Sequence, residues 1–211
     1  MTRLFISLCI FLALAPGSVL ADRDDVATAA NALKAGRYGE AVQLAKPLSD
    51  AGNPDAQLLM GILYFGGLGV AKSPNKAFEL YTKAAEQGQA AAMHNLATMY
   101  YRGEGTNINF GLSRDWNRKA AENGLVVAQH DYASMLRSGV GGPPDRQKAR
   151  FWFKKAADAG YANAAYKLGL MLRSGPGSNA RASVAYLCKA AYGNHPEARQ
   201  ALGSNIQHCR R

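Results

Sequence analysis

The sequence predicts an all-α protein, a solenoid in which antiparallel helix hairpins are stacked in sequence order. Three observations predict it. Small residues recur every 36 residues, as in the series Ala56, Ala92, Ala128 and Ala164. Within each interval, apolar residues follow helical spacing and are bounded by glycines. Alanine dominates the apolar residues, which favours closely packed helices over strands.

The 36-residue interval is kept at many positions, which identifies a tandem array rather than a chance similarity. Small side chains occupy Gly61, Ala97, Ala133 and Gly169. A glycine that precedes a second glycine by two residues recurs as Gly67, Gly103, Gly139 and Gly175. In the fourth copy a deletion of two residues moves the paired alanines of the second helix to Ala190-Ala191.

Each copy is interpreted as two helices, and the first copy illustrates the reasoning. Apolar residues at helical spacing follow Ala56, and Gly67 permits the left-handed conformation with which a helix ends. After Pro74, a second helix is expected from Asn75 to Gln87. The small residue at position 61 lets the two helices approach closely.

This pattern resembles the Sel-one-like repeat family, which is related to the tetratricopeptide repeats. The first copy carries the motifs Met60-Gly61, Leu63-Tyr64, Gly67-Leu68-Gly69-Val70, Leu80-Tyr81 and Lys83-Ala84-Ala85. The resemblance covers about residues 24–206 and implies a right-handed α/α superhelical solenoid whose first helices line a concave groove. The second copy departs from the family pattern with Leu112-Ser113 in place of Lys-Ala, and the fourth copy has a shortened linker and lacks the lysine.

The expected domain organisation follows from these repeats. A signal peptide is predicted at 1–21, a divergent capping hairpin at 22–55, and a capping helix with a tail at 194–211. The four repeats are predicted at 56–91, 92–127, 128–163 and 164–193.

The N-terminus has the layout of a cleavable export signal. Arg3 precedes an apolar run from Leu4 to Leu14, and Val19-Leu20-Ala21 suits cleavage after Ala21. The alternative, a retained membrane anchor, is disfavoured because the run is too short to span a bilayer. We therefore expect a periplasmic or secreted protein without a transmembrane segment after signal cleavage.

Positive charge is concentrated toward the C-terminus. Residues 22–130 hold eleven basic and eleven acidic side chains, whereas residues 131–211 hold thirteen basic and four acidic ones. The excess is interpreted either as a solvated face or as a surface for an acidic partner, an anionic polysaccharide or a lipid. No nucleic acid partner is expected, because the chain carries an export signal.

Residues that vary between copies at a fixed register are the candidates for binding specificity. They lie on the first helix of each copy, at spacings that place them on one helix face, and the family resemblance implies that this face looks into the groove. The alternative is that these positions vary because nothing constrains them. The predicted partner-binding residues are Asn95, Tyr101, His130, Asp131, Arg137, Tyr166, Lys167 and Arg173. Arg137 and Arg173 are the strongest, since a guanidinium suits carboxylates and phosphates.

Two cysteines follow the predicted signal. Cys188 is in register with Thr82, Arg118 and Lys154, which indicates an outward-facing position. A disulfide to Cys209 is predicted, because exported proteins meet an oxidising compartment.

No catalytic, cofactor-binding or metal-ligating pattern is recognised. The four histidines do not have metal-ligand spacing, and no nucleophile–base or paired-carboxylate arrangement is found. The leading interpretation is a non-catalytic adaptor or scaffold that binds a protein or peptide in the cell envelope. Recognition of an anionic envelope polymer or lipid surface by the basic repeats is the alternative, and a cell-wall hydrolase is a remote third.

Overall fold

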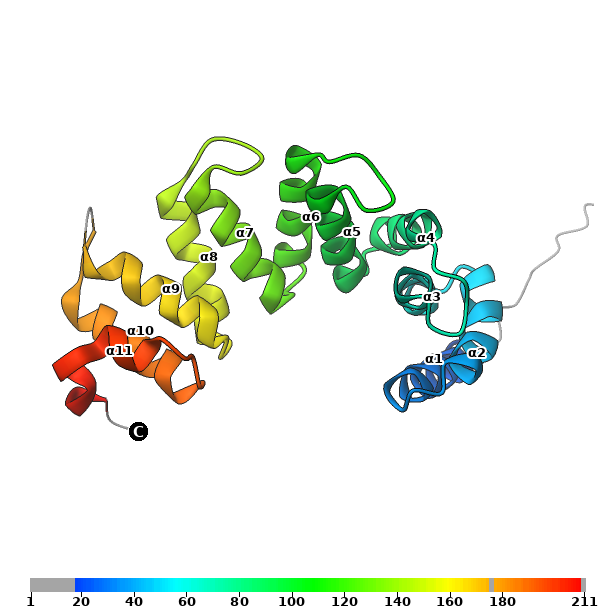
Figure 1. Ribbon diagram of the computed structural model, residues 1–211, viewed down its shortest axis with the longest axis horizontal. Coiled ribbons are helices and arrows are strands. Elements are labelled where there is room, and N and C mark those ends of the chain that lie inside the picture. Colours follow the sequence, from blue (N-terminus) through cyan, green and yellow to red (C-terminus); the bar gives the residue numbers. More distant parts are fainter. Residues whose placement is uncertain (1–17, 175–176, 210–211) are drawn as a thin grey trace, which may run out of the picture.

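The structure, a computed structural model, is an open arc of helices that follow one another along the chain (Figure 1). It describes residues 18–174 and 177–209. Within these ranges every regular element is helical and no strand occurs, so the predicted all-α fold is confirmed. The α-helices are α1 (Ser18–Lys34), α2 (Tyr38–Asp50), α3 (Pro54–Gly66), α4 (Pro74–Glu86), α5 (Ala90–Arg102), α6 (Phe110–Glu122), α7 (Val126–Ser138), α8 (Arg146–Asp158), α9 (Ala162–Arg173), α10 (Ala180–Tyr192) and α11 (Ala198–Leu202).

The helices pack as hairpins that stack in sequence order. Each odd-numbered helix from α1 to α9 packs against the helix that follows it, and each even-numbered helix then packs against the first helix of the next hairpin. The second and fourth copies depart from the family pattern, but the second helix of each keeps its length. Helices α6 and α10 have 13 residues, as α4 does. Stacking between chain neighbours confirms the predicted solenoid.

Local capping sets the helix ends. The Asn53 side chain accepts hydrogen bonds from the backbone N–H groups of Asp55 and Ala56, and Pro54 supplies a first residue whose missing N–H is not needed. The first repeat helix therefore starts two residues before the expected Ala56. At the other end Gly67 has φ 68°, the left-handed conformation that was predicted there.

In the first and fourth repeats, a small residue of one helix faces a large residue of the other inside the hairpin. Tyr81 of α4 is buried and packs on Gly61 of α3, where an added Cβ atom would lie 2.5 Å from the tyrosine ring. In the fourth repeat Leu187 packs on Gly169 in the same way. The buried core consequently runs along the whole array, from the first hairpin to α11.

The C-terminal end differs in detail from its prediction. One capping helix with a tail was expected over residues 194–211, but α11 ends at Leu202 and a 3-10 helix continues from Gly203 to His208. The predicted disulfide between Cys188 and Cys209 is present, with the Cα atoms 5.4 Å apart. The outward position expected for Cys188 is wrong, since the residue is 7% exposed. The C-terminal segment that the bond holds in place covers it.

Parts of two predictions lie outside the described residues. These are residues 1–17 of the expected signal peptide and Gly175 of the glycine series. Residues 18–21 belong to α1. Among the described helices, none combines the length and the apolar character that crossing a membrane requires.

Candidate partner-binding site

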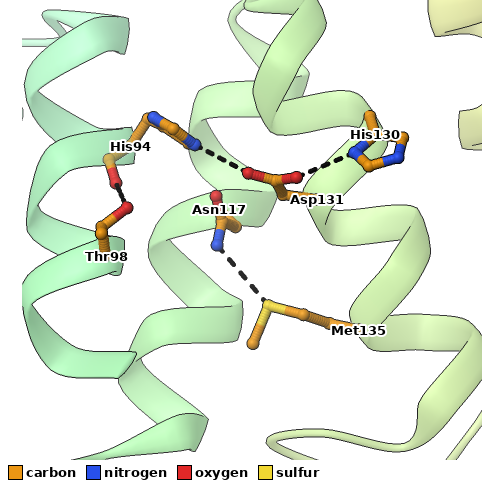
Figure 2. Close-up of polar contacts among 6 residues, drawn as sticks. All are labelled: His94, Thr98, Asn117, His130, Asp131 and Met135. Carbon is orange, nitrogen blue, oxygen red and sulfur yellow. Dashed lines mark hydrogen bonds and ion pairs between the residues drawn. The ribbon is translucent and has the colours of Figure 1, made fainter. Parts of the chain in front are cut away.

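One carboxylate links the second and third repeats. Asp131, on α7, accepts hydrogen bonds from His94 Nε2 of α5 at 2.9 Å and from its neighbour His130 Nδ1 at 2.8 Å (Figure 2). Each histidine contacts a different carboxylate oxygen. Both ring nitrogens must therefore carry a proton, which fixes the orientation of the two rings.

The histidines determine the charge state of this carboxylate. Burial on its own would raise the pKa of Asp131, but the hydrogen bonds from His130 and His94 outweigh burial and hold its pKa below the ordinary value of 3.8. Asp131 is therefore ionised at neutral pH. Its side chain is 40% exposed, so the negative charge remains accessible from the surface.

Beside Asp131, a pocket of about 370 Å³ opens between α5, α6 and α7, and we call it the junction pocket. Helix α5 contributes Thr98, Tyr101 and Arg102 to its wall. Helix α7 and the residues that follow it contribute Asp131, Ser134, Met135, Arg137, Ser138 and Val140. Arg102 and Arg137 are exposed. Neither guanidinium group makes a hydrogen bond or ion pair with any residue that the structure describes.

Helix α6 adds two buried polar residues to the junction pocket. Ser113 is fully buried and Asn117 is 6% exposed. The Ser113 hydroxyl and the Asn117 amide oxygen have no partner among the described residues. The Asn117 amide nitrogen donates only to the sulfur of Met135, at 3.5 Å, and the oxygen is turned away from that sulfur (Figure 2). Unpartnered buried polar atoms are rare in folded proteins, so they mark this wall as unusual.

The structure brings some of the predicted residues together. Tyr101, Asp131 and Arg137 line the junction pocket, and His130 contacts Asp131. Asn95 lies one repeat earlier, in a smaller pocket that Tyr81 also lines. These five residues form one continuous region across α5 and α7.

The other three predicted residues lie apart, at the C-terminal end. Tyr166 is 8% exposed, because His195 stacks on its ring at a centroid distance of 4.0 Å. The Lys167 ammonium lies 5.6 Å from the centre of the same ring. Arg173 donates to the backbone carbonyl of Ala201 at 3.2 Å and so ties α9 to α11. These contacts stabilise the terminal cap and leave less surface for a partner.

The sequence prediction missed Arg102, Ser113 and Asn117. The column of the repeat that holds Tyr81, Phe153 and Leu187 in three copies holds Asn117 in the second. This polar residue in a column of large apolar residues was the available signal. His94, on the first helix of the second repeat, was not among the predicted residues either.

A larger cavity, of about 730 Å³, lies elsewhere, between α10 and the residues before Cys209. Val184, Ala185 and Tyr192 supply much of its mainly apolar wall. None of the described buried polar atoms without a partner lies there. It has the character of a gap between the last hairpin and the tail, so it is a weaker candidate.

In the part of the chain that the structure describes, no group of three or more His, Cys, Asp or Glu side chains is arranged to hold a metal ion.

Comparison with family models identifies four copies of the Sel1 repeat, at residues 54–89, 90–125, 126–161 and 162–195. Each matched copy starts at the first residue of α3, α5, α7 or α9, two residues before the predicted divisions. No curated protein matches the sequence significantly.

Solved structures give the same result. A Sel1 repeat protein from Oxalobacter formigenes is 33% identical, with a TM-score of 0.80, over 86% of this chain and 73% of that one. A protective antigen from uropathogenic Escherichia coli, described as having an SLR fold, is 30% identical, with a TM-score of 0.76, over 79% of this chain and 36% of that one. An immunity protein from Pseudomonas aeruginosa shares the fold at 21% identity, with a TM-score of 0.55, over 84% of this chain and 68% of that one.

Proposed function

The chain belongs to the Sel1-repeat family, whose solenoids generally mediate protein interactions, and on that premise we propose that it is an exported, non-catalytic adaptor that binds a protein or peptide partner. The junction pocket is the observation that carries the proposal. It combines guanidinium groups that have no partner among the described residues with buried polar atoms that likewise lack one there, and a polar group of a partner that enters the pocket would supply their hydrogen bonds.

The charges of the basic repeats favour a protein partner over a polyanion. Arg150 donates to the backbone carbonyls of Gly177 and Met171, and Arg173 donates to that of Ala201. Lys189 and Lys154 both pair with Asp158. These four of the thirteen basic side chains in residues 131–211 are thus engaged within the chain. A polyanion-binding surface would need these groups free and clustered.

A hydrolase is the least favoured function. Among the described residues that line the junction pocket, Asp131 is the one carboxylate, and both its oxygens are held by histidines. With its pKa lowered, it does not carry the proton that a general acid must supply at neutral pH. Purified protein should therefore produce no clearing in a gel that contains cell-wall peptidoglycan.

Export is supported by the N-terminal pattern and by the disulfide, which suits an oxidising compartment. We expect the mature chain to begin at Asp22. Mass spectrometry of the protein recovered from the periplasmic or secreted fraction tests this, and an intact N-terminus would contradict it.

The partner-binding function is tested by capture from envelope extract at low and high salt. Binding through a specific pocket should weaken mildly as ionic strength rises, whereas binding to a polyanion should weaken steeply.

Arg137→Ala should reduce capture without lowering the melting temperature, because Arg137 has no partner within the described chain. Arg173→Ala should chiefly lower the melting temperature, because Arg173 ties α9 to α11. Arg199→Ala, on the exposed face of α11, is the control. Capture unchanged by Arg137→Ala would contradict the assignment of this site.

A further inference from the structure

The junction pocket is an enlarged copy of a smaller pocket one repeat earlier. The smaller pocket has a volume of about 90 Å³ and is lined by Phe65, Tyr81, Asn95, Thr98, Met99 and Arg102. Adding 36 to each number gives Tyr101, Asn117, Asp131, Ser134, Met135 and Ser138, all of which line the junction pocket. The same place in two consecutive repeats therefore differs about fourfold in volume.

One position explains the difference. Tyr81 fills the earlier junction with its ring, and Asn95 lines the same small pocket. One repeat later, Asn117 replaces the tyrosine and Asp131 replaces the asparagine. The shorter side chain leaves the space of a ring empty, and Asp131 has no tyrosine of its own chain at the place where Tyr81 lies beside Asn95. A buried polar residue in a column otherwise filled by Tyr81, Phe153 and Leu187 destabilises the fold, so function is the expected reason for it.

The chemistry of the wall defines what fits. The inner polar atoms include two acceptors, the Asn117 amide oxygen and the Asp131 carboxylate, which has lone pairs beyond those used by the histidines. The Ser113 hydroxyl can both accept and donate. Tyr101, Met135 and Val140 add aromatic and apolar surface suited to a ring. A cationic occupant is disfavoured, because Arg102 and Arg137 outnumber the single negative charge of Asp131. A neutral ring that ends in a hydrogen-bond donor meets all these conditions.

The surface around the pocket indicates that the ring belongs to a protein chain. Ile108, Phe110 and Leu112 are 59%, 44% and 39% exposed, and the Phe110 ring packs against Tyr101 at a centroid distance of 5.2 Å. Such exposed apolar side chains next to a polar pocket are typical of a protein interface. The free guanidinium groups of Arg102 and Arg137 are suited to carboxylates on the same partner.

We propose that the junction pocket receives a tyrosine side chain of a protein partner, whose hydroxyl donates to Asp131 or Asn117 while neighbouring acidic residues bind Arg102 and Arg137. The partner thus supplies the ring that Tyr81 supplies within the first repeat. This inference rests on the proposed adaptor function and names the chemistry of its partner.

Peptides test the proposal directly. Fluorescence anisotropy is measured with the purified chain and a labelled twelve-residue peptide that has one tyrosine between glutamates, together with its phenylalanine, alanine and lysine counterparts. We expect the tyrosine peptide to bind about fivefold more tightly than the phenylalanine peptide, because of the hydroxyl. It should bind at least about tenfold more tightly than the alanine peptide, because of the ring. An alanine or lysine peptide that binds as well as the tyrosine peptide overturns the proposal, as does the absence of tyrosine-peptide binding up to about 1 mM.

Variants locate the binding. Asn117→Tyr restores the residue of the first repeat and fills the pocket from within, so it should lower affinity for the tyrosine peptide at least about tenfold while the melting temperature holds or rises. Asn117→Leu, which copies Leu187, is the second variant if Asn117→Tyr does not fold. Arg137→Gln should weaken binding several-fold and Arg199→Gln should not. Unchanged affinity in the folded pocket-filling variant places the peptide elsewhere and overturns the proposal.

The two proposals fail in different ways. If envelope capture depends on Arg137 but the tyrosine peptide binds no better than the alanine peptide, the adaptor function stands and the tyrosine inference is wrong. If Arg137→Ala leaves envelope capture unchanged while the tyrosine peptide binds and Asn117→Tyr abolishes that binding, the pocket binds tyrosine as inferred, but its assignment as the site of the captured partner is wrong.

Discussion

His94 donates a hydrogen bond from Nε2 to Asp131 Oδ2 at 2.9 Å, and this contact joins the first helices of two consecutive repeats (Figure 2). The remaining oxygen of the carboxylate is held by His130. In the preceding junction the equivalent residue is Asn95, which is uncharged and lines a smaller pocket together with Tyr81. The third repeat is therefore oriented partly by an electrostatic contact, whose strength depends on the ionisation of one side chain.

Acid should weaken this contact. Since the folded-state pKa of Asp131 is lowered, its contribution to stability is present above the ordinary value of 3.8 and is lost as the pH falls below it. The wild-type chain should therefore lose more free energy of unfolding than Asp131→Asn between about pH 6 and pH 3. Urea unfolding at both pH values measures this. The control is Asp115→Asn, which removes an exposed carboxylate 3.9 Å from Arg118. Equal acid sensitivity of wild type and Asp131→Asn contradicts the prediction.

Exchanging the two residues that set pocket size should change stability in opposite directions. Tyr81→Asn empties a buried ring site and should lower the free energy of unfolding by about 3 kcal/mol. Asn117→Leu fills an existing space and removes an unpartnered amide, so it should raise that free energy by about 1 kcal/mol. Chemical denaturation at neutral pH measures both. A destabilised Asn117→Leu that remains folded would show that the second repeat is built around the amide.

The small residue at position 61 should be required only while Tyr81 is present. In Gly61→Ala the new Cβ atom would lie 2.5 Å from the Tyr81 ring, so the variant should lose about 1–3 kcal/mol of stability. Alanine already occupies the matching position in the second repeat, where Ala97 faces the column of Asn117. The penalty of Gly61→Ala should therefore shrink in a Tyr81→Asn background. A double-mutant cycle measures the coupling, and strictly additive effects would count against it.

Reduction of the disulfide should destabilise the C-terminal end first. The bond between Cys188 and Cys209 closes a segment of 21 residues and holds the tail over α10. Its loss should lower the free energy of unfolding by about 3 kcal/mol. Hydrogen exchange with and without a reductant should show lost protection in α10 and α11 while α5 and α7 stay protected. Cys188→Ser with Cys209→Ser is the matched variant. Uniform loss of protection along the chain would contradict a local role.

The repeat determined most of the fold in advance. A 36-residue interval fixes which residues share a register, so the hairpins, their stacking order and the close contact at Gly61 followed from periodicity. The start of the first repeat helix was placed two residues late, because the Asn53 cap and Pro54 act before the apolar pattern begins. The position of Cys188 was misjudged, because register describes a repeat that is followed by another, and the last repeat is followed by the tail.

The sequence by itself determined a helical solenoid with a terminal disulfide and a variable stripe along its first helices. Only the tertiary structure decided which members of that stripe act together, because burial and partnering depend on neighbours that are distant in sequence. It placed Asp131 between two histidines and set Arg173 against α11. It left the Arg137 guanidinium without a partner among the described residues. It also decided that the exchange of a large residue for Asn117 opens a pocket. The volume that a side chain leaves empty is set by the helices packed around it.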